Sequence, residues 1–301
     1  QRPRPSAPDV AVLVDPPRWP AHGTQFGHLV SDASLDELHA FARAAGVPPR
    51  AFDHDHYDVP VARYPDLLAL GAVQVGSTEL LKRLVAAGLR VRPAQRTPRR
   101  PAARAAAESA WPLLGTDGLR DNLLDRWSEP QRVYHDVRHL AQCLDALRQL
   151  QPQPAPRPVV LAVWFHDAVY QGDPGADERA SAQLADQRLA GLVPPDEVRE
   201  VVRLVLGTIA HDPAPGDHNA ALLMDADLSV LGQIRGRYHV YARDVREEYI
   251  RYDDESYRRG RLAVLDDLLG RAQLFHTQSG RALWEEAARR NLAEERTRLA
   301  G

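Results

Sequence analysis

The chain has 301 residues, of which 44% are hydrophobic and 26% charged, and its formal net charge is -3. This length favours two domains over one, and the balance of residue types is that of a soluble globular protein. The small net charge excludes an overall basic field of the kind that attracts nucleic acid or an anionic membrane.

Cys143 is the only cysteine, which excludes an internal disulfide and is typical of a reducing compartment. The first nine residues are rich in proline and contain no apolar signal-peptide core. No apolar run approaches the roughly 20 residues that span a bilayer. We therefore expect a soluble, cytoplasmic protein.

The N-terminal part predicts a small α/β domain. Residues 10–14 (VAVLV) are a β-branched run that ends at Asp15, which indicates a buried strand. Ser34 followed by Glu37 predicts a capping box, and the helix that it opens should stop at Gly46. An apolar run near 67–75 and a helix near 77–87 complete this unit.

Residues 93–110 are rich in arginine, proline and alanine and show no amphipathic period that could bury a face. We interpret them as an interdomain linker. The linker would separate a small α/β domain at residues 1–92 from a second domain at residues 111–301.

The second domain is predicted to be an all-α bundle, because long helical segments alternate with polar breaks and no strand alternation occurs. The overall fold class is therefore mainly α. The expected helices lie near 117–127, 130–150, 158–171, 177–190, 195–210, 218–232, 236–252, 255–275 and 280–299.

The adjacent pair His166-Asp167 follows an apolar run at residues 159–165. Two strongly polar residues at the end of a buried helix are costly unless they are paired or bind a metal. A solvated helix end is the alternative interpretation.

On the expected helix at 130–150, Arg132, His135 and His139 fall on one face, opposite an apolar stripe. Two histidines four residues apart can share a ligand sphere. They can equally be ordinary surface histidines, because periodicity does not decide whether this face lines a polar cleft or meets solvent.

Asp225 and Asp227 lie in an apolar stretch, which argues against a fully solvated position. Because they are two residues apart on a helix, we do not expect one metal to take both. Compensation of helix N-terminal charge is the alternative role. Imidazole and carboxylate groups together suit divalent metals where no thiolate is present.

Four phrases in the second half occur in a recognisable order: Tyr134-His135 with His139-Leu140, then Trp164-Phe-His166-Asp167, then Asp225-Ala-Asp227-Leu228, and finally Arg246-Glu-Glu-Tyr249. Together they resemble the HD superfamily of metal-dependent phosphohydrolases, over nearly all of residues 112–301. The resemblance implies four metal ligands, which are His139, His166, Asp167 and Asp227. His135 is the alternative to His139, and Asp225 is a candidate to contact the ligands without binding the metal.

The function that this resemblance implies is hydrolysis of phosphate esters, of nucleotides or related small phosphorylated molecules, by hydroxide generated on a divalent metal ion (Mn, Mg, Co, Ni, Fe or Zn). Such an ion lowers the pKa of bound water from about 15.7 toward roughly 7. Asp167 would orient the water, Glu247 or Glu248 would carry the proton, and Arg132 and Arg246 would clamp phosphate. The remaining substrate contacts would come from His135, His211 and Tyr249, with His211 also a candidate for a second metal.

A non-catalytic nucleotide-binding or sensing module is the alternative function for the same residues. In either case we expect a small phosphorylated partner, preferably a nucleotide, with no membrane and no stable nucleic-acid partner. A homodimer is compatible with the sequence.

The first ninety residues resemble a domain of unknown function, DUF4031. The resemblance rests on the strand that ends at Asp15, on Gly27-His28-Leu29 and on His56-Tyr57-Asp58. It supplies no activity. Residues 53–58 (DHDHYD) could form a metal-binding segment or a polar surface loop, and the sequence leaves both interpretations open.

Overall fold

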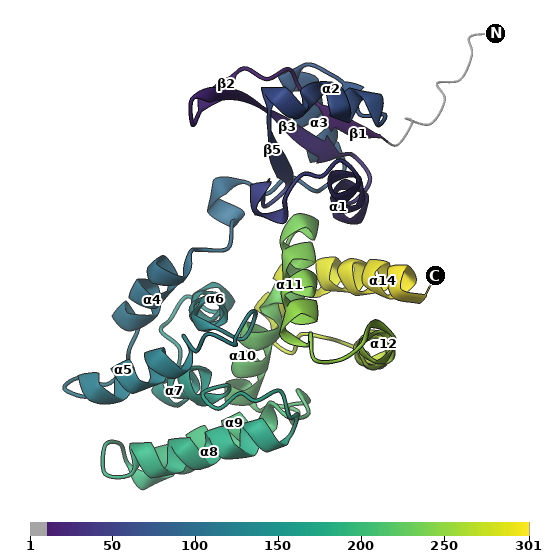
Figure 1. Cartoon of the computed structure of the whole chain (residues 1–301). Coiled ribbons are helices and arrows are strands. Elements are labelled where there is room, and N and C mark those ends of the chain that lie inside the picture. Colours follow the sequence, from purple (N-terminus) through teal and green to yellow (C-terminus); the bar gives the residue numbers. More distant parts are fainter. Residues whose placement is uncertain (1–10, 301) are drawn as a thin grey trace. The chain divides into compact units, whose positions relative to one another are not determined.

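The structure is a computed structural model that describes residues 11–300, and these residues divide into two units (Figure 1). One unit extends to Arg96 and includes Ile234–Val240, and the other comprises the remainder. The proline-rich start and Val10 of the expected first strand lie outside the described residues. The domain boundaries expected at 1–92, 93–110 and 111–301 stay predictions.

The first unit contains a mixed sheet with the strand order β4-β5-β3-β1-β6, and β2 pairs with β3. Strand β1 pairs antiparallel with β3 and parallel with β6, and β3 pairs antiparallel with β5. The strands are β1 Val12–Val14, β2 Trp19–Ala21, β3 Thr24–Ser31, β4 Phe52–Asp53, β5 His56–Pro60 and β6 Val73–Gln74.

Three helices accompany this sheet: α1 Leu35–Ala44, α2 Tyr64–Ala69 and α3 Ser77–Ala86. Short 3-10 turns occupy Pro49–Ala51, Val61–Arg63 and Pro93–Gln95. Apolar side chains from strands and helices form one core, which includes Leu13, Leu29, Leu38, Leu67 and Leu84. The small α/β unit expected from the sequence is therefore confirmed.

The local predictions in this unit hold unevenly. Ser34 caps α1 by accepting the amide of Glu37, and Gly46 follows the helix with a φ of 66°. The capping box is incomplete, because the Glu37 carboxylate accepts a hydrogen bond from Ser31 instead. The apolar run at 67–75 divides between α2 and β6, and strands β3 and β5 were not predicted.

The second unit is helical throughout its regular elements, as the sequence predicts. Its helices are α4 Arg100–Ser109, α5 Asp117–Arg126, α6 Val137–Leu150, α7 Arg157–Phe165, α8 Ala176–Leu189, α9 Pro195–Gly207, α10 His218–Asp227, α11 Arg235–Glu248, α12 Asp254–Gly270, α13 Gln278–Gly280 and α14 Glu286–Ala300. A 3-10 turn at Leu228–Gly232 follows α10, and a π-helical turn at Arg281–Glu285 joins α13 to α14. Helix α11 begins among the residues grouped with the first unit.

Helix α7 is the buried centre of this unit. Its residues from Leu161 to Phe165 are all buried, and it packs against α6, α8, α9 and α10. A helix that is apolar on all sides is stable only when other elements surround it. The chain therefore carries the polar pair that follows α7 into the interior.

Two sequence-based expectations are wrong. Helix α6 begins at Val137 rather than near residue 130, because the Asp136 side chain accepts the amide of Arg138 and caps the helix there. The expectation that no face of 93–110 could be buried is also wrong. Ala103 and Ala107 are buried on α4, because their small side chains let that helix pack closely against α6.

Among residues 11–300, no helix combines the length and the apolar character that crossing a bilayer demands.

Candidate metal centre

Four polar side chains meet where three helices of the second unit begin or end. His139 lies in the first turn of α6, His166 caps α7 with Asp167 directly after it, and Asp227 is the last residue of α10. The two histidine side chains are 1% exposed, whereas the two carboxylates are 16% and 14% exposed. The nitrogen donors are therefore buried and the oxygen donors lie toward the opening.

The donor atoms of this group are spaced as a metal ion requires. The two Nε2 atoms are 3.3 Å apart, His139 Nε2 lies 3.0 Å from Asp227 Oδ1, and His166 Nε2 lies 3.3 Å from Asp167 Oδ2. The remaining nitrogen-to-oxygen distances are 3.7 and 3.9 Å. Ligand bonds of about 2.0–2.2 Å place neighbouring donors roughly 3.0–3.4 Å apart and opposite donors about 4.2 Å apart. His139, His166 and Asp227 therefore fit a single ion, and Asp167 Oδ2 lies near both imidazoles as a further oxygen donor.

Neighbouring groups orient three of these side chains. His166 Nδ1 donates to the carbonyl of Val163 at 2.9 Å, so its Nε2 lone pair is free for the centre. His139 Nδ1 lies 3.1 Å from the Tyr134 hydroxyl. His211 Nε2 lies 2.7 Å from Asp227 Oδ2, which leaves Oδ1 facing the histidines. Metal-binding histidines and carboxylates are commonly held by such outer contacts.

The electrostatics of the group favour a cation. Burial works to lower the pKa of His166, but Asp167 and Asp227 outweigh it and raise that pKa to about 9. Burial works in the opposite sense at Asp227, whose pKa nevertheless falls well below its usual range beside His166 and His139. Asp167 and Asp227 thus favour a proton on the His166 imidazole. A metal ion bound at the same place would supply the positive charge instead.

Cys143 belongs to the same buried cluster and was not predicted. It forms a candidate metal-binding group with His139, His166 and Asp227, whose donor atoms all lie within 4.8 Å of one another. Its Sγ is 3.6 Å from His139 Nε2. Burial and the nearby carboxylates raise the thiol pKa well above its usual value, so the sulfur is neutral. Its position one turn after His139 on α6 was the available signal.

A cavity of about 140 Å³ opens beside Asp167 and Asp227 and is also lined by His135, Tyr170 and Tyr249. His135 Nδ1 lies 2.6 Å from Glu248 Oε2, and its ring stacks on Tyr170 with centroids 4.5 Å apart. Burial works against it, but Glu248 raises the pKa of His135. Glu248 thereby favours the protonated form of the imidazole that lines the cavity.

Glu248, which the sequence offered only beside Glu247 as a candidate proton carrier, has a different role in the structure. Its Oε1 accepts the amides of Val133, Tyr134 and His135, and its Oε2 accepts the Tyr170 hydroxyl. Burial works to raise its pKa, yet the hydrogen bond with His135 and the accepted amides lower it to about 2. Glu248 is therefore an ionised anchor for the segment before α6, and no sequence feature ranked it above Glu247.

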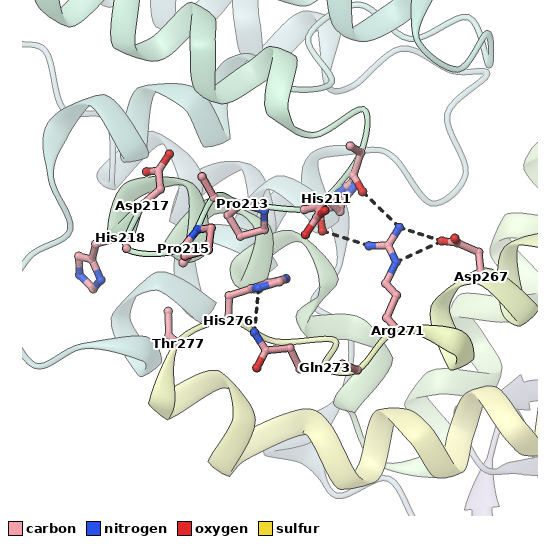
Figure 2. A pocket seen from close by; sticks show the side chains of 16 residues that line it. His211, Pro213, Pro215, Asp217, His218, Asp267, Arg271, Gln273, His276 and Thr277 are labelled. Carbon is pink, nitrogen blue, oxygen red and sulfur yellow. Dashed lines mark hydrogen bonds and ion pairs between the residues drawn. The ribbon is translucent and has the colours of Figure 1, made fainter.

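His211 also lines a second, larger hollow of about 1130 Å³ (Figure 2). This groove lies between the loop after α9 and the segment after α12, and it includes His218 and His276. Arg271 donates to the carbonyl of His211 and pairs with Asp267, which ties the two sides together. His211 has a φ of 48°, a left-handed conformation that is uncommon outside glycine.

The predicted role of Arg132 as a phosphate clamp is corrected. Arg132 precedes α6, so it does not share a helix face with His135 and His139. Its side chain is 0% exposed, and it donates to the carbonyls of His135, Asp167 and Ala168. Its guanidinium therefore holds main-chain carbonyls beneath the centre and pairs with Glu129.

Three other predicted residues also lie away from the centre. Arg246 donates to the carbonyls of Tyr249 and Tyr252 and pairs with Asp254, so it caps the end of α11. Glu247 does not line the cavity. Asp225 accepts the amides of His276 and Thr277, which anchors that segment instead of a metal. The structure thus brings His139, His166, Asp167, Asp227, His135, His211 and Tyr249 to one site, and leaves out Arg246, Glu247 and Asp225.

Comparison with known proteins identifies a family match for one part of the chain. Residues 12–87 match the family described as a protein of unknown function, DUF4031. That match coincides with the sheet and helices of the first unit. No match was found among the curated proteins or the solved structures.

Proposed function

We propose that the second unit is an HD-type, metal-dependent phosphohydrolase of small phosphate esters, with nucleotides as the preferred class. One observation carries the proposal: His139, His166, Asp167 and Asp227 present two imidazole nitrogens and two carboxylate oxygens at metal-ligand spacing. Two nitrogen and two oxygen donors suit a divalent ion such as Mn, Fe, Co, Ni or Zn.

When bound, such an ion would polarise a phosphate oxygen and lower the pKa of a water molecule. The chain's own groups prepare the site for an anion. The two buried histidines exclude solvent behind the centre, and His211 holds Asp227 in place. Asp167 lines the cavity, where it can accept a proton from water.

A histidine in the cavity supports phosphate over an uncharged substrate. His135 lines the same cavity as Asp167 and Asp227, and its contact with Glu248 raises its pKa. In its protonated form this imidazole can hold a phosphate oxygen or donate a proton to the leaving alkoxide. Tyr170 and Tyr249 add hydroxyl groups to the same wall.

The size of the cavity supports a substrate whose small reacting group enters it while the rest of the substrate stays outside. Pockets for complete small molecules span about 300–1,000 Å³, whereas the cavity at the centre has about 140 Å³. It therefore suits the phosphoryl group alone. The groove that shares His211 is large enough for a nucleoside.

A metal analysis followed by a phosphate-release panel tests the proposal. The full chain is loaded separately with Mn²⁺, Fe²⁺, Co²⁺, Ni²⁺ and Zn²⁺ and offered nucleoside phosphates and p-nitrophenyl phosphate. We expect release that requires metal and that Asp167→Asn abolishes. Asp145→Asn, an exposed change on α6 outside the site, is the matched control.

Two outcomes would overturn the proposal. Absence of metal binding at His139 and His166 would make the cluster a protonated polar core. Metal and nucleotide binding without turnover by any loaded form would favour the sensing module instead.

A further inference from the structure

The first unit holds a separate group of metal-type ligands on one face of its sheet. The register of β3 and β5 places His28 directly opposite Asp58, and His56 lies two residues before Asp58 on the same strand. Residues opposite each other and residues two apart on a strand share a face. The donor atoms of these three residues all lie within 4.8 Å of one another.

A buried carboxylate contacts the Nδ1 atom of each imidazole and so orients its ring. His28 Nδ1 lies 3.3 Å from Asp15 Oδ2, and His56 Nδ1 lies 2.6 Å from Asp55 Oδ1. With each Nδ1 directed at an aspartate, both Nε2 atoms face the third residue, at 3.9 and 3.4 Å from the same Asp58 oxygen. A carboxylate behind a histidine that faces a shared centre is the usual outer contact of a metal site.

The two aspartates are themselves fixed by the fold. Asp15 accepts the amide of His28 and the hydroxyl of Ser77, and Asp55 accepts the amide of Val91. Gly27 explains how the strands come so close, because a β-carbon there would meet the carbonyl oxygen of Asp15 at 2.5 Å. The fold of the sheet thus fixes the two aspartates that orient His28 and His56.

Charge and access also favour an ion. Asp15, Asp55 and Asp58 carry three negative charges around two imidazoles, and Arg90 pairs with Asp55. The His28 and Asp58 side chains are 28% and 47% exposed, so the centre opens to solvent. Three protein ligands with an open side describe a site that keeps a position for water or a small anion.

We propose that His28, His56 and Asp58 bind a divalent metal ion of the zinc type, independently of the centre in the second unit. Two imidazoles and one carboxylate without a thiolate select a borderline ion rather than Mg²⁺ or Ca²⁺. The open position gives this unit a binding capacity for water or a small anionic ligand.

Cobalt titration of the full chain tests this site, with the visible absorption of the bound ion and equilibrium dialysis as readouts. If both centres bind, the wild type takes two equivalents, His166→Ala takes one, and adding His56→Ala removes the last. If the centre of the second unit does not bind, His166→Ala changes nothing while His56→Ala still removes one equivalent. The two proposals therefore fail separately.

A gentler variant guards against loss of folding. Asp58→Asn preserves shape at an exposed position, and we expect it to weaken Co²⁺ and Zn²⁺ binding at this site by at least 100-fold with an unchanged circular dichroism spectrum. His39→Ala, in the same unit but outside the group, should keep full affinity. Unchanged stoichiometry and affinity in Asp58→Asn would overturn the proposal and leave a network of ion pairs.

Discussion

The buried guanidinium of Arg132 offers the sharpest test of the site's construction. It donates to three carbonyls, at 3.0 Å to His135, 2.7 Å to Asp167 and 3.3 Å to Ala168. The first carbonyl precedes α6 and the other two follow α7. Arg132 therefore fastens together the two segments that carry the candidate ligands.

Replacing Arg132 by methionine keeps an unbranched chain of similar length and removes every donor. Three carbonyls then lose their partners in the interior, and each costs about 1.5 kcal/mol, so the free energy of unfolding should fall by roughly 4.5 kcal/mol. Total stabilities of about 5–15 kcal/mol leave the variant folded in water. Because Asp167 loses its main-chain anchor, metal affinity should also fall, by about 10–100-fold.

Urea unfolding of the metal-free protein, followed by circular dichroism, measures the first effect, and metal titration measures the second. Arg148→Met is the matched control, because Arg148 is exposed on α6 and its loss should change stability by no more than about 0.5 kcal/mol. The reasoning fails if Arg132→Met keeps wild-type stability and metal affinity while phosphoester hydrolysis alone declines. That result would restore the phosphate clamp expected from the sequence.

Three further predictions follow from buried contacts. The hydrogen bond with His135 lowers the pKa of Glu248 to about 2, so ionised Glu248 stabilises the folded protein above about pH 4.5 and this stabilisation is lost as the pH falls toward 2. In urea unfolding at pH 3 and pH 6, Glu248→Gln should therefore lose less stability on acidification than the wild type. Equal acid sensitivity of the two proteins would contradict this prediction. Cys143→Ala should change metal affinity by less than about 10-fold if the thiol stays neutral, whereas a complete loss would identify a thiolate ligand. Gly232→Ala should lower the melting temperature strongly, because a β-carbon there would lie 2.7 Å from Trp284 Cα, and an unchanged melting curve would show that the backbone shifts freely.

Much of the helical unit could be predicted because its signals are local. The apolar run of α7 predicted a buried helix, and the polar pair after it predicted a paired or metal-bound end, since both depend on neighbouring residues. Strands β3 and β5 could not be predicted in the same way. Their pairing joins residues about thirty positions apart, and β3 does not alternate regularly between buried and exposed positions.

The start of α6 shows how a local signal can be misjudged. Apolar periodicity extended the expected helix to residue 130, but Asp136 caps it one residue before Val137. An aspartate before an apolar run is a known start signal, so this boundary was present in the sequence. Its consequence was large, because it moved Arg132 and His135 off the helix and into separate roles.

By itself, the sequence determined the mainly helical class of the second unit, the small α/β unit before it and the residue types of the candidate centre. These follow from periodicity, from capping residues and from the cost of burying polar groups. The choice of Asp227 over Asp225 came from the family resemblance. Only the tertiary structure decided that Arg132 serves the main chain and that Cys143 joins the cluster. The physical reason is that a side chain's partner depends on which helix ends meet, and the packing of distant segments determines that.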